Sequence, residues 1–401
     1  MSTNIQKNQI TEGIIWRQLL LFFFPILLGT FFQQLYNTID SVIVGQFVGK
    51  EALAAVGGSS AQIVAFVVGF FTGLSSGASV TIAQFFGAKD SRSANKGLHT
   101  AYAIAAFGGL ILTVSGIILT PFLLEMMNTP ADIVADSAVY LRIYFAGIIF
   151  VLIYNMGSAI LRATGDSKRP LYYLIVCCII NIVLDVLFVI VFHMGVMGVA
   201  VATLIAQAVS AVLVTLKLMR SEGILKLSVK QIRFHGSILK MQLKLGLPTG
   251  FEAILFSITN IAIQSAVNTF GTDTTAAWSA YGKLDAIFWM VSTAFGIAIT
   301  TFVGQNYGAG KMDRVRKSTR VCLLMDFIVS AVLVVFLIAA RFLLFRLFTN
   351  DSHVIEIGCD MLVLITPWYI VYVFIEVIAG ALRGVGNVVV PVAITCLLYT
   401  S

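Results

Sequence analysis

Five acidic side chains lie inside long apolar stretches of the sequence, where a charge is costly. They are Asp40, Asp185, Glu252, Asp285 and Glu376. If these stretches cross a membrane, an ionised acid near its centre costs about 2.5–3.5 kcal/mol even on the more lenient insertion scale. Because burial penalises the charged form, a carboxyl group in a closed pocket can hold a proton and release it when water enters. Each of the five acids therefore needs a cavity, a partner or a proton.

Polar side chains at helical spacing accompany the two acids of the first half. Residues three or four positions apart share one face of a helix. The sets at this spacing are Gln33, Asn37 and Asp40, then Asn181 and Asp185, then Thr203 and Gln207. Three such stripes predict a polar pocket in the first half of the chain. The alternative is that these side chains form interhelical hydrogen bonds that serve packing alone, as Asn, Gln and Thr often do in membranes.

The second half offers a rival set. Glu252 lies in an apolar stretch shortly after a proline, and Tyr372 and Glu376 are four residues apart. These three residues are a possible second-lobe cation site; otherwise they line a substrate cavity. Asp285 is two residues from Lys283, so the two side chains do not face each other on a helix. Asp285 is assigned to the substrate cavity, with a purely structural pairing as the alternative.

The elements that carry these residues are predicted to be membrane-spanning helices. Of the 401 residues, 59% are hydrophobic and 11% are charged, whereas a soluble domain has about 25% charged residues. About 20 apolar residues cross the hydrocarbon core as a helix. The predicted spans are residues 18–44, 57–83, 98–120, 137–161, 171–192, 197–218, 247–270, 276–303, 321–345 and 358–382. A further stretch begins near residue 388, so the prediction is an all-α polytopic membrane protein with ten complete helices and part of an eleventh.

Basic residues concentrate on one side of the predicted membrane. With the N-terminus inside, all but five of the 26 Lys and Arg residues fall in inside segments; the five are Lys50, Arg142, Lys283, Arg341 and Arg346. The positive-inside rule then predicts a cytoplasmic N-terminus in a multi-pass protein of the cell membrane. The net charge of +7 does not indicate nucleic acid, because the basic residues are spread over separate loops. The polar start and the absence of a cleavage site argue against a cleaved signal peptide.

Two sequence motifs recur in the second half of the chain, and both are shifted by the same offset in residue number. Residues 84–88 (QFFGA) correspond to 305–309 (QNYGA), and residues 161–165 (LRATG) correspond to 382–386 (LRGVG). Both motifs lie at inside ends of predicted helices. The repeat contains an even number of helices, so its two copies have the same orientation. Parallel repeats of this kind are one of the two repeat types found in transporters.

The repeat predicts two lobes. A segment rich in Lys and Arg, residues 219–246, is expected to be a cytoplasmic loop between an N-terminal lobe (1–218, helices 1–6) and a C-terminal lobe (247–401, helices 7–10 and part of 11). If the same offset holds to the end of the first copy, the second copy should end beyond Ser401. Helix 12 and most of helix 11 are therefore expected to be missing, and the chain is expected to be a C-terminally truncated form of a twelve-helix protein.

These motifs resemble those of the multidrug and toxic compound extrusion (MATE) family. The relevant segments are 25–29 (PILLG), 33–40 (QQLYNTID), 84–88 and 161–166 (LRATGD), with the second copy at 382–386. The resemblance covers the chain from about residue 14. It implies two six-helix lobes around a central cavity, and expulsion of drugs against an ion gradient.

The resemblance also assigns roles to individual residues. In that family an Asp of helix 1, an Asn and an Asp of helix 5 and a Thr of helix 6 form the cation or proton site. The matching residues here are Asp40, Asn181, Asp185 and Thr203. Related transporters place a sodium-linked site in the second lobe, at positions matching Glu252, Tyr372 and Glu376.

The expected function is secondary active antiport, in which cationic or amphipathic organic compounds are exported by alternating access in exchange for protons or sodium ions. Neither a cofactor nor a metal other than possible sodium is expected. The expected partners are small organic cations and membrane lipids, and the protein is expected to be a monomer. Residues assigned to the substrate cavity are Gln33, Asn37, Gln207 and Asp285.

Two other functions agree less well with the sequence. A flippase for lipid-linked saccharide precursors should present cationic side chains to a diphosphate headgroup, whereas this sequence places mainly acids in its apolar stretches. An intramembrane enzyme would need a catalytic set. Residues 73–77 (GLSSG) match G-x-S-x-G, but a nucleophile elbow needs a strand before the Ser and a helix after it. Here the motif lies within one predicted helix, so no enzyme is expected.

Overall fold

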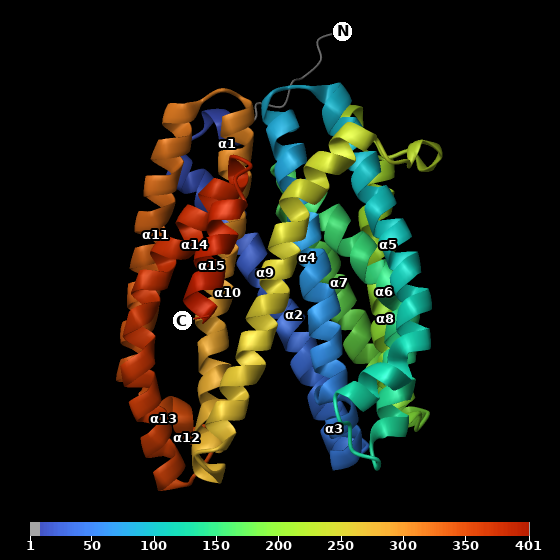
Figure 1. Cartoon of the computed structure of the whole chain (residues 1–401), viewed down its shortest axis with the longest axis vertical. Coiled ribbons are helices and arrows are strands. Elements are labelled where there is room, and N and C mark those ends of the chain that lie inside the picture. The colour runs from blue at the N-terminus through green and yellow to red at the C-terminus, as the bar shows by residue number, and fades with distance from the viewer. Residues whose placement is uncertain (1–8, 401) are drawn as a thin grey trace. The chain divides into compact units, whose positions relative to one another are not determined.

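The computed structural model describes residues 9–400, and the side chains of residues 10–395. Within that range the chain is helical and contains no β-strand (Figure 1). The α-helices are α1 (Gln9–Glu12), α2 (Ile15–Phe47), α3 (Lys50–Gly57), α4 (Ser59–Gly87), α5 (Ser91–Met126), α6 (Val134–Ala163), α7 (Lys168–Asp185), α8 (Gly195–Met219), α9 (Gly236–Asn268), α10 (Thr272–Gly308), α11 (Met312–Ala339), α12 (Arg341–Arg346), α13 (Ser352–Ile365), α14 (Tyr369–Gly384) and α15 (Val389–Thr400). Short turns of other types are the π-helix η1 (Val186–Val191) and the 3-10 helices η2 (Gly223–Leu225), η3 (Val229–Gln231) and η4 (Thr366–Trp368).

The predicted membrane helices are confirmed. Ten helical segments of the described chain are long and apolar enough to cross a membrane, and each contains one of the ten predicted spans or most of it. Helix α15 covers the start of the predicted eleventh. The N-terminal eight residues, with Lys7 and the predicted cytoplasmic N-terminus, lie outside the described residues.

Helix α9 begins earlier than predicted, so the last part of the predicted loop 219–246 is helical. Its first turns bury Ile238, Gln242 and Leu245, which are three or four residues apart, and expose Lys240 and Lys244. Such a pattern is typical of an amphipathic helix. The lysines suggested a loop, but one face of this segment packs on the protein while the other can reach water.

The predicted span 358–382 is interrupted by a short 3-10 helix. Helix α13 ends at Ile365, and α14 begins at Tyr369 after the turn that contains Pro367. Proline cannot donate a backbone hydrogen bond and disrupts a helix interior. The equivalent position in the first copy of the repeat holds Ala146, and α6 continues through it. The break determines where Tyr369 and the following polar residues of α14 lie.

The chain separates into two compact units. Unit 1 comprises residues up to Leu27 and from Leu255 onward, and unit 2 comprises Leu28–Ile254. The divisions fall within α2 and α9, a few residues after Pro25 and Pro248, so each of these helices contributes to both units. The lobes 1–218 and 247–401 were derived from the sequence repeat, which is a different criterion, and they stay a prediction.

In unit 2, helix α6 is central and packs against α4, α5 and α8, which run alongside it (Figure 1). Its core includes Leu98, Ile148 and Ile160, none of them accessible to solvent. Helices α4 and α9 approach through glycines, because a Cβ at Gly77 would collide with the backbone of Gly246. Small residues allow such close approach between membrane helices.

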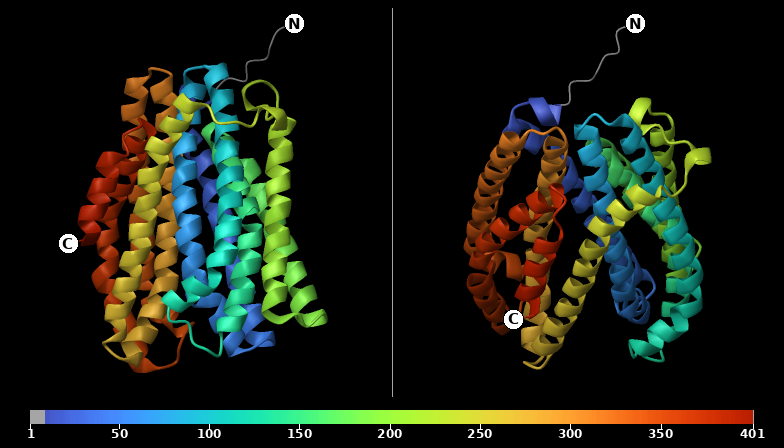
Figure 2. Two further views of the ribbon diagram at one scale, coloured as in Figure 1. Left: turned by 45° about the vertical axis from the view of Figure 1, so that its right-hand side comes forward. Right: turned by 45° about the horizontal axis from the view of Figure 1, so that its top comes forward.

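In unit 1, helix α10 packs against α11 and α14, and the two views of Figure 2 show the three side by side. The first part of α2 contributes aromatic side chains to this core. Phe23 stacks on Phe295 with ring centroids 4.0 Å apart, and Phe22 meets Phe302 edge to face at 6.1 Å. Such pairs add to the stabilisation from buried area.

The two-copy repeat is confirmed in the helix boundaries. Helix ends and starts in the two units are related by the same offset in residue number that separates the sequence motifs. The matched positions are Gly87 and Gly308, Ser91 and Met312, Ala163 and Gly384, and Lys168 and Val389.

The turns at the motifs also share their backbone geometry. Gly165 and Gly386 have φ angles of 96° and 91°, a region that only glycine enters readily. The bond from Asp166 N to Leu161 O matches the bond from Asn387 N to Leu382 O, and both are 2.9 Å. The repeated glycines are therefore required by the conformation that ends each helix.

A short connection between α8 and α9 is fastened to the start of α5. Asn95 donates to the carbonyl oxygens of Ile224 and Lys226 at 3.0 and 3.1 Å. The Nε2 atom of buried His99 accepts from the backbone N–H of Ser228 at 3.0 Å, and its Nδ1 lies 2.8 Å from Asn95 O. Since a carbonyl can only accept, the hydrogen of this ring must be on Nδ1.

Candidate functional site

Unit 2 contains a buried polar cluster built from three helices. Asp40 comes from α2, Asn181 and Asp185 from α7, and Thr203 and Gln207 from α8. All five are buried, and Asp185 has no accessible surface. The sequence prediction that Asp40, Asn181, Asp185 and Thr203 belong together agrees with this arrangement.

The cluster is held together by few hydrogen bonds. Asn181 Nδ2 donates to Thr203 Oγ1 at 3.5 Å. The side chains of Asp185, Asn181 and Thr203 all lie within hydrogen-bonding reach of the carboxyl group of Asp40. One oxygen of Asp40 and both oxygens of Asp185 accept no hydrogen bond within the described protein. Such oxygens are rare in protein interiors and call for an explanation such as a bound ion or proton.

The local structure of α7 helps to position Asp185. It is the last residue of α7, and the chain continues directly into the π-helix η1. The backbone N–H of Phe192 bonds to Leu187 O, five residues earlier, at 2.9 Å. π-helical turns are uncommon and occur frequently at functional sites. The change of helix type begins directly after the acid.

On α2 the buried face differs from the predicted stripe. Gln33 and Asn37 are exposed, whereas Tyr36 is buried with Asp40 one turn later. Gln207 Nε2 donates to the Tyr36 hydroxyl at 3.2 Å. Tyr36 was not a predicted site residue, although its spacing of four from Asp40 was a usable signal. The predicted role of Gln33 and Asn37 in a substrate cavity remains a prediction.

Unit 1 contains a second polar cluster around Asp285 of α10. The Tyr369 hydroxyl donates to one carboxylate oxygen, and Trp289 Nε1 donates to the other at 2.8 Å. Tyr369 also contacts the hydroxyl of Tyr281, and its ring stacks on Phe288 with centroids 4.3 Å apart. Lys283 is exposed and is not a partner of Asp285 in this cluster. Asp285 is thus enclosed by aromatic donors.

The predicted pair Tyr372 and Glu376 is confirmed as a contact on α14. Tyr372 donates to Glu376 Oε2 at 3.3 Å, and Arg383 Nη1 lies 3.5 Å from Glu376 Oε1. Arg383 had been interpreted only as a topological charge. Glu252, the third member of the predicted second site, lies in the section of α9 that belongs to unit 2 and is buried there.

The arrangement around Glu376 fits a metal cation poorly. Hard cations prefer shells of several oxygen ligands, and here a guanidinium already pairs with the carboxylate. Among the described residues no group of three or more His, Cys, Asp and Glu side chains could hold a metal ion.

One buried acid was missed by the sequence analysis. Asp326 of α11 has no accessible surface, and Ser330 Oγ donates to its Oδ1 at 3.1 Å. The signal was available, because Asp326 is the single acid within the predicted span 321–345.

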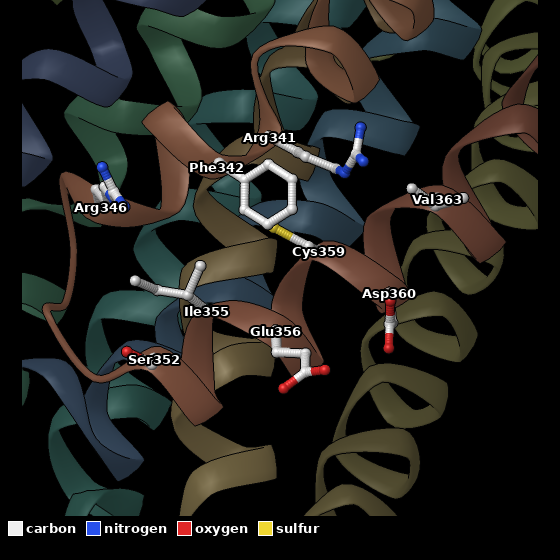
Figure 3. Close-up of a pocket in the computed structure, with 9 residues that line it drawn as sticks. All are labelled: Arg341, Phe342, Arg346, Ser352, Ile355, Glu356, Cys359, Asp360 and Val363. Atoms are coloured by element: carbon white, nitrogen blue, oxygen red, sulfur yellow. The ribbon is translucent and has the colours of Figure 1, made fainter.

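A hollow beside α12 and α13 involves none of these residues (Figure 3). Arg341, Arg346, Glu356 and Asp360 are spread around it rather than converging on one point. Arg341 lies over the ring of Phe342, 4.7 Å from its centroid. The hollow is thus separate from the buried clusters of acids.

Comparison with known proteins links this architecture to one family. The model of the MatE family matches residues 25–187 and 248–400, one segment in each copy of the repeat. Probable multidrug resistance protein YoeA of Bacillus subtilis is 30% identical over 389 residues, covering 95% of this chain and 84% of that protein. Probable multidrug resistance protein NorM of Thermotoga maritima is 28% identical over 403 residues, covering 98% and 84%.

The fold agrees with solved structures. One, described as the outward-facing conformation of a multidrug resistance MATE family transporter of the MOP superfamily, aligns with a TM-score of 0.91 at 22% identity. The alignment covers 98% of this chain and 88% of that chain.

Proposed function

This chain belongs to the MATE family of membrane transporters, and on that premise we propose that it is a secondary active antiporter exporting cationic or amphipathic organic compounds in exchange for protons or sodium ions. It is a transporter and not an enzyme. The relatives are bacterial multidrug resistance proteins, which supports location in the plasma membrane, with the N-terminus on the cytoplasmic side. The proposed partners are small organic cations and membrane lipids, and the proposed functional form is a monomer.

The observation that carries this proposal is the Asp40 and Asp185 cluster of unit 2. It buries two carboxylates, and none of the five clustered side chains is basic. Neighbouring buried carboxylates cannot both ionise at low cost. A bound proton or monovalent cation would lower the negative charge of the pair by one and change the hydrogen bonds that Asn181 and Thr203 can make. The cluster therefore has the means to favour one conformation of unit 2 when an ion binds.

The energy available to such a coupling is sufficient for efflux. One elementary charge that moves through 100 mV supplies about 2.3 kcal/mol. Since each 1.4 kcal/mol is a tenfold change in a concentration ratio, this supports a gradient of roughly 50-fold for a neutral compound. One coupled ion is thus enough for physiologically useful export.

The flippase alternative is less well supported. A diphosphate headgroup would need basic side chains that are free to bind it, and Arg383 is instead paired with Glu376. The polar clusters of both units contain acids, with buried Asp40 and Asp185 in one and partly buried Asp285 in the other. Acids attract organic cations and repel phosphates.

The test is ethidium uptake into proteoliposomes that contain the full chain, with proton and sodium gradients imposed separately. We expect one of the two gradients to drive uptake against the ethidium gradient. Uptake that responds to neither gradient would refute antiport. We expect Asp40→Asn and Asp185→Asn to abolish the response, because an amide keeps the shape but carries neither proton nor charge.

The same assay ranks the carboxylates. Glu252→Gln and Glu376→Gln should reduce transport less than Asp40→Asn does, and Asp360→Asn, which changes an exposed acid of α13, should leave it unchanged. If the Asp40 and Asp185 variants transport at the wild-type rate while a Glu252 or Glu376 variant does not, the coupling site is elsewhere than proposed.

A further inference from the structure

The connection between α8 and α9, residues 220–235, is held at the boundary of the membrane. Its backbone is bound by Asn95, His99 and Thr100 of α5. Two of these anchors, His99 and Thr100, already belong to the predicted span 98–120. Figure 1 shows this segment, in yellow-green, projecting sideways beyond the upper end of α5. The connection is therefore fixed beside the point where α5 enters the lipid.

One aromatic side chain of the connection extends onto the lipid-facing side of α5. The ring of Phe234 meets the ring of Phe107 edge to face, with centroids 6.0 Å apart. Both side chains remain about half exposed, at 46% and 57%, and Phe107 lies within the predicted span. Leu110, Val114 and Ile118, further along α5, are also exposed. A continuous exposed apolar surface of this kind contacts lipid, so Phe234 lies where the lipid begins.

The same connection is strongly basic. Residues 217–244 contain seven basic residues and one acid, Glu222. Lys226, Lys230 and Arg233 are exposed, and no ion pair within the described part of the chain involves these three. Arg233 Nε donates to the Nε2 atom of the neighbouring His235 at 3.3 Å. Since a guanidinium has five N–H donors, most of them remain for an outside acceptor.

Basic and apolar side chains on one segment at the membrane boundary are typical of sites for anionic lipids. The stems of Lys and Arg lie along apolar surface while their charged ends reach the headgroups, and a guanidinium suits a phosphate oxygen pair. Free phosphate or a nucleic acid would use the same positive charges. Neither would use the exposed ring of Phe234, which lies against the lipid-facing side of α5.

We propose that Lys230, Arg233 and Phe234 form a binding site for one anionic phospholipid, with its headgroup at the two basic side chains and an acyl chain along Phe107 and Leu110. The site deepens the lipid partnership proposed above, and its assignment to the cytoplasmic leaflet rests on the proposed topology. Each basic residue near an anionic surface strengthens binding roughly fivefold. The site therefore selects anionic lipids over zwitterionic ones.

The first experiment measures lipid selectivity beside Phe107. A bimane fluorophore is attached at Leu110→Cys of the full chain, in a background without the native cysteines, in phosphatidylcholine nanodiscs that contain a minor fraction of phosphatidylglycerol. A quenching spin label is carried in mid-chain on one lipid or the other, and the ratio of the two quenching efficiencies gives the local preference. We expect a preference for phosphatidylglycerol of roughly fivefold or more. At Ile118→Cys, about two turns further along α5, the preference should be near one.

Charge variants assign the preference to the connection. Lys230→Gln combined with Arg233→Gln should bring the preference at Leu110 close to one. Lys50→Gln, which removes an exposed lysine at the start of α3, should leave it unchanged. A wild-type preference near one, or an unchanged preference in the double variant, would overturn the proposal. Thermal unfolding in detergent verifies that the double variant folds.

Competition distinguishes a lipid headgroup from free phosphate. Sodium phosphate and sodium chloride at equal ionic strength should lower the preference equally, because both only screen the charges. A loss of preference with phosphate alone would mean that the site binds free phosphate, and the assignment to lipid would be wrong.

The variant Phe234→Ser tests the position of the site on α5. Loss of the ring contact should lower the preference at Leu110 although every charge is kept, whereas Gln231→Ser, an exposed polar position of the same connection, should have no effect. An unchanged preference in Phe234→Ser would contradict the placement beside Phe107. None of these measurements depends on transport, so failure of the lipid site is distinguishable from failure of antiport, which the ethidium assay detects.

Discussion

At the scale of single residues, Asp185 combines complete burial with two oxygens that accept no hydrogen bond. An unpaired buried acceptor destabilises a protein by about 1–3 kcal/mol. Proteins tend to break such local rules where function requires it. Asp185 is therefore expected to lower the stability of unit 2 while it serves ion coupling.

We predict that Asp185→Asn leaves the unfolding temperature in detergent unchanged or raises it, with a gain of up to about 1–3 kcal/mol, because the amide removes a buried charge and adds donors. Thermal unfolding of the purified full chain measures this effect. Asp360→Asn, in which the acid is exposed, serves as the control and should have no effect. A clear fall in the unfolding temperature of Asp185→Asn would mean that the carboxylate stabilises the protein.

At the scale of elements, the connection between α8 and α9 depends on side chains of α5. His99 and Asn95 bind its backbone, and Thr100 Oγ1 accepts from His235 N at 3.3 Å. Desolvation and the neighbouring Arg233, Lys96 and His99 lower the pKa of His235 from its ordinary value of about 6.5. The docked connection thus binds a proton on His235 less readily than the undocked one.

We predict that docking of this connection weakens as pH falls below about 6.5. The pKa of His235 is lower in the docked state than in the undocked state, so its contribution to docking is complete above the pKa of the undocked state and is lost as the pH falls below it. Limited proteolysis near Lys226 and Lys230 should be faster at acid pH, and His99→Ala should be cut rapidly at every pH. His353→Ala, at an exposed position of α13, is the control. Equal cutting of the two variants would contradict the role of His99 in holding the connection.

At the scale of the whole molecule, the repeat and the distribution of charge define a topology. The turn after α4 and the turn after α10 are equivalent in the two copies, and both carry basic residues. Equivalent positions of parallel repeats lie on the same side of the membrane. The connection after α8 should lie on that side too, because α8 ends the first six-helix copy.

We predict that cysteines introduced at Glu222 and Asp313 resist a membrane-impermeant thiol reagent in intact cells, whereas one at Thr272 reacts. All three positions are exposed, so accessibility depends on the side of the membrane. The assay uses a cysteine-free background, and labelling after cell lysis confirms that each site can react. Rapid labelling of Glu222→Cys before lysis would reverse the topology.

The sequence by itself determined the membrane helices, the repeat and the family. The reason is physical, since a helix that crosses a bilayer must satisfy its own backbone and present about 20 apolar residues. The common offset of the two motifs reappeared in the helix boundaries because the glycines of the repeated motifs end helices in one specific conformation. The contact between Tyr372 and Glu376 could also be predicted from the sequence, because residues four positions apart on one helix are neighbours.

Only the tertiary structure decided which face of each helix is buried and which residues from other helices contact it. On α2, both Asn37 and Tyr36 are within one turn of Asp40, and packing buried Tyr36 and exposed Asn37. Spacing along one helix cannot choose between such faces, because the choice depends on the helices that pack against it. Arg383 counted only among the basic residues of the inside segments, yet its Nη1 lies 3.5 Å from Glu376 Oε1 in the fold. Contacts between residues far apart in the sequence follow from helix packing, which the spacing of residues along one chain does not encode.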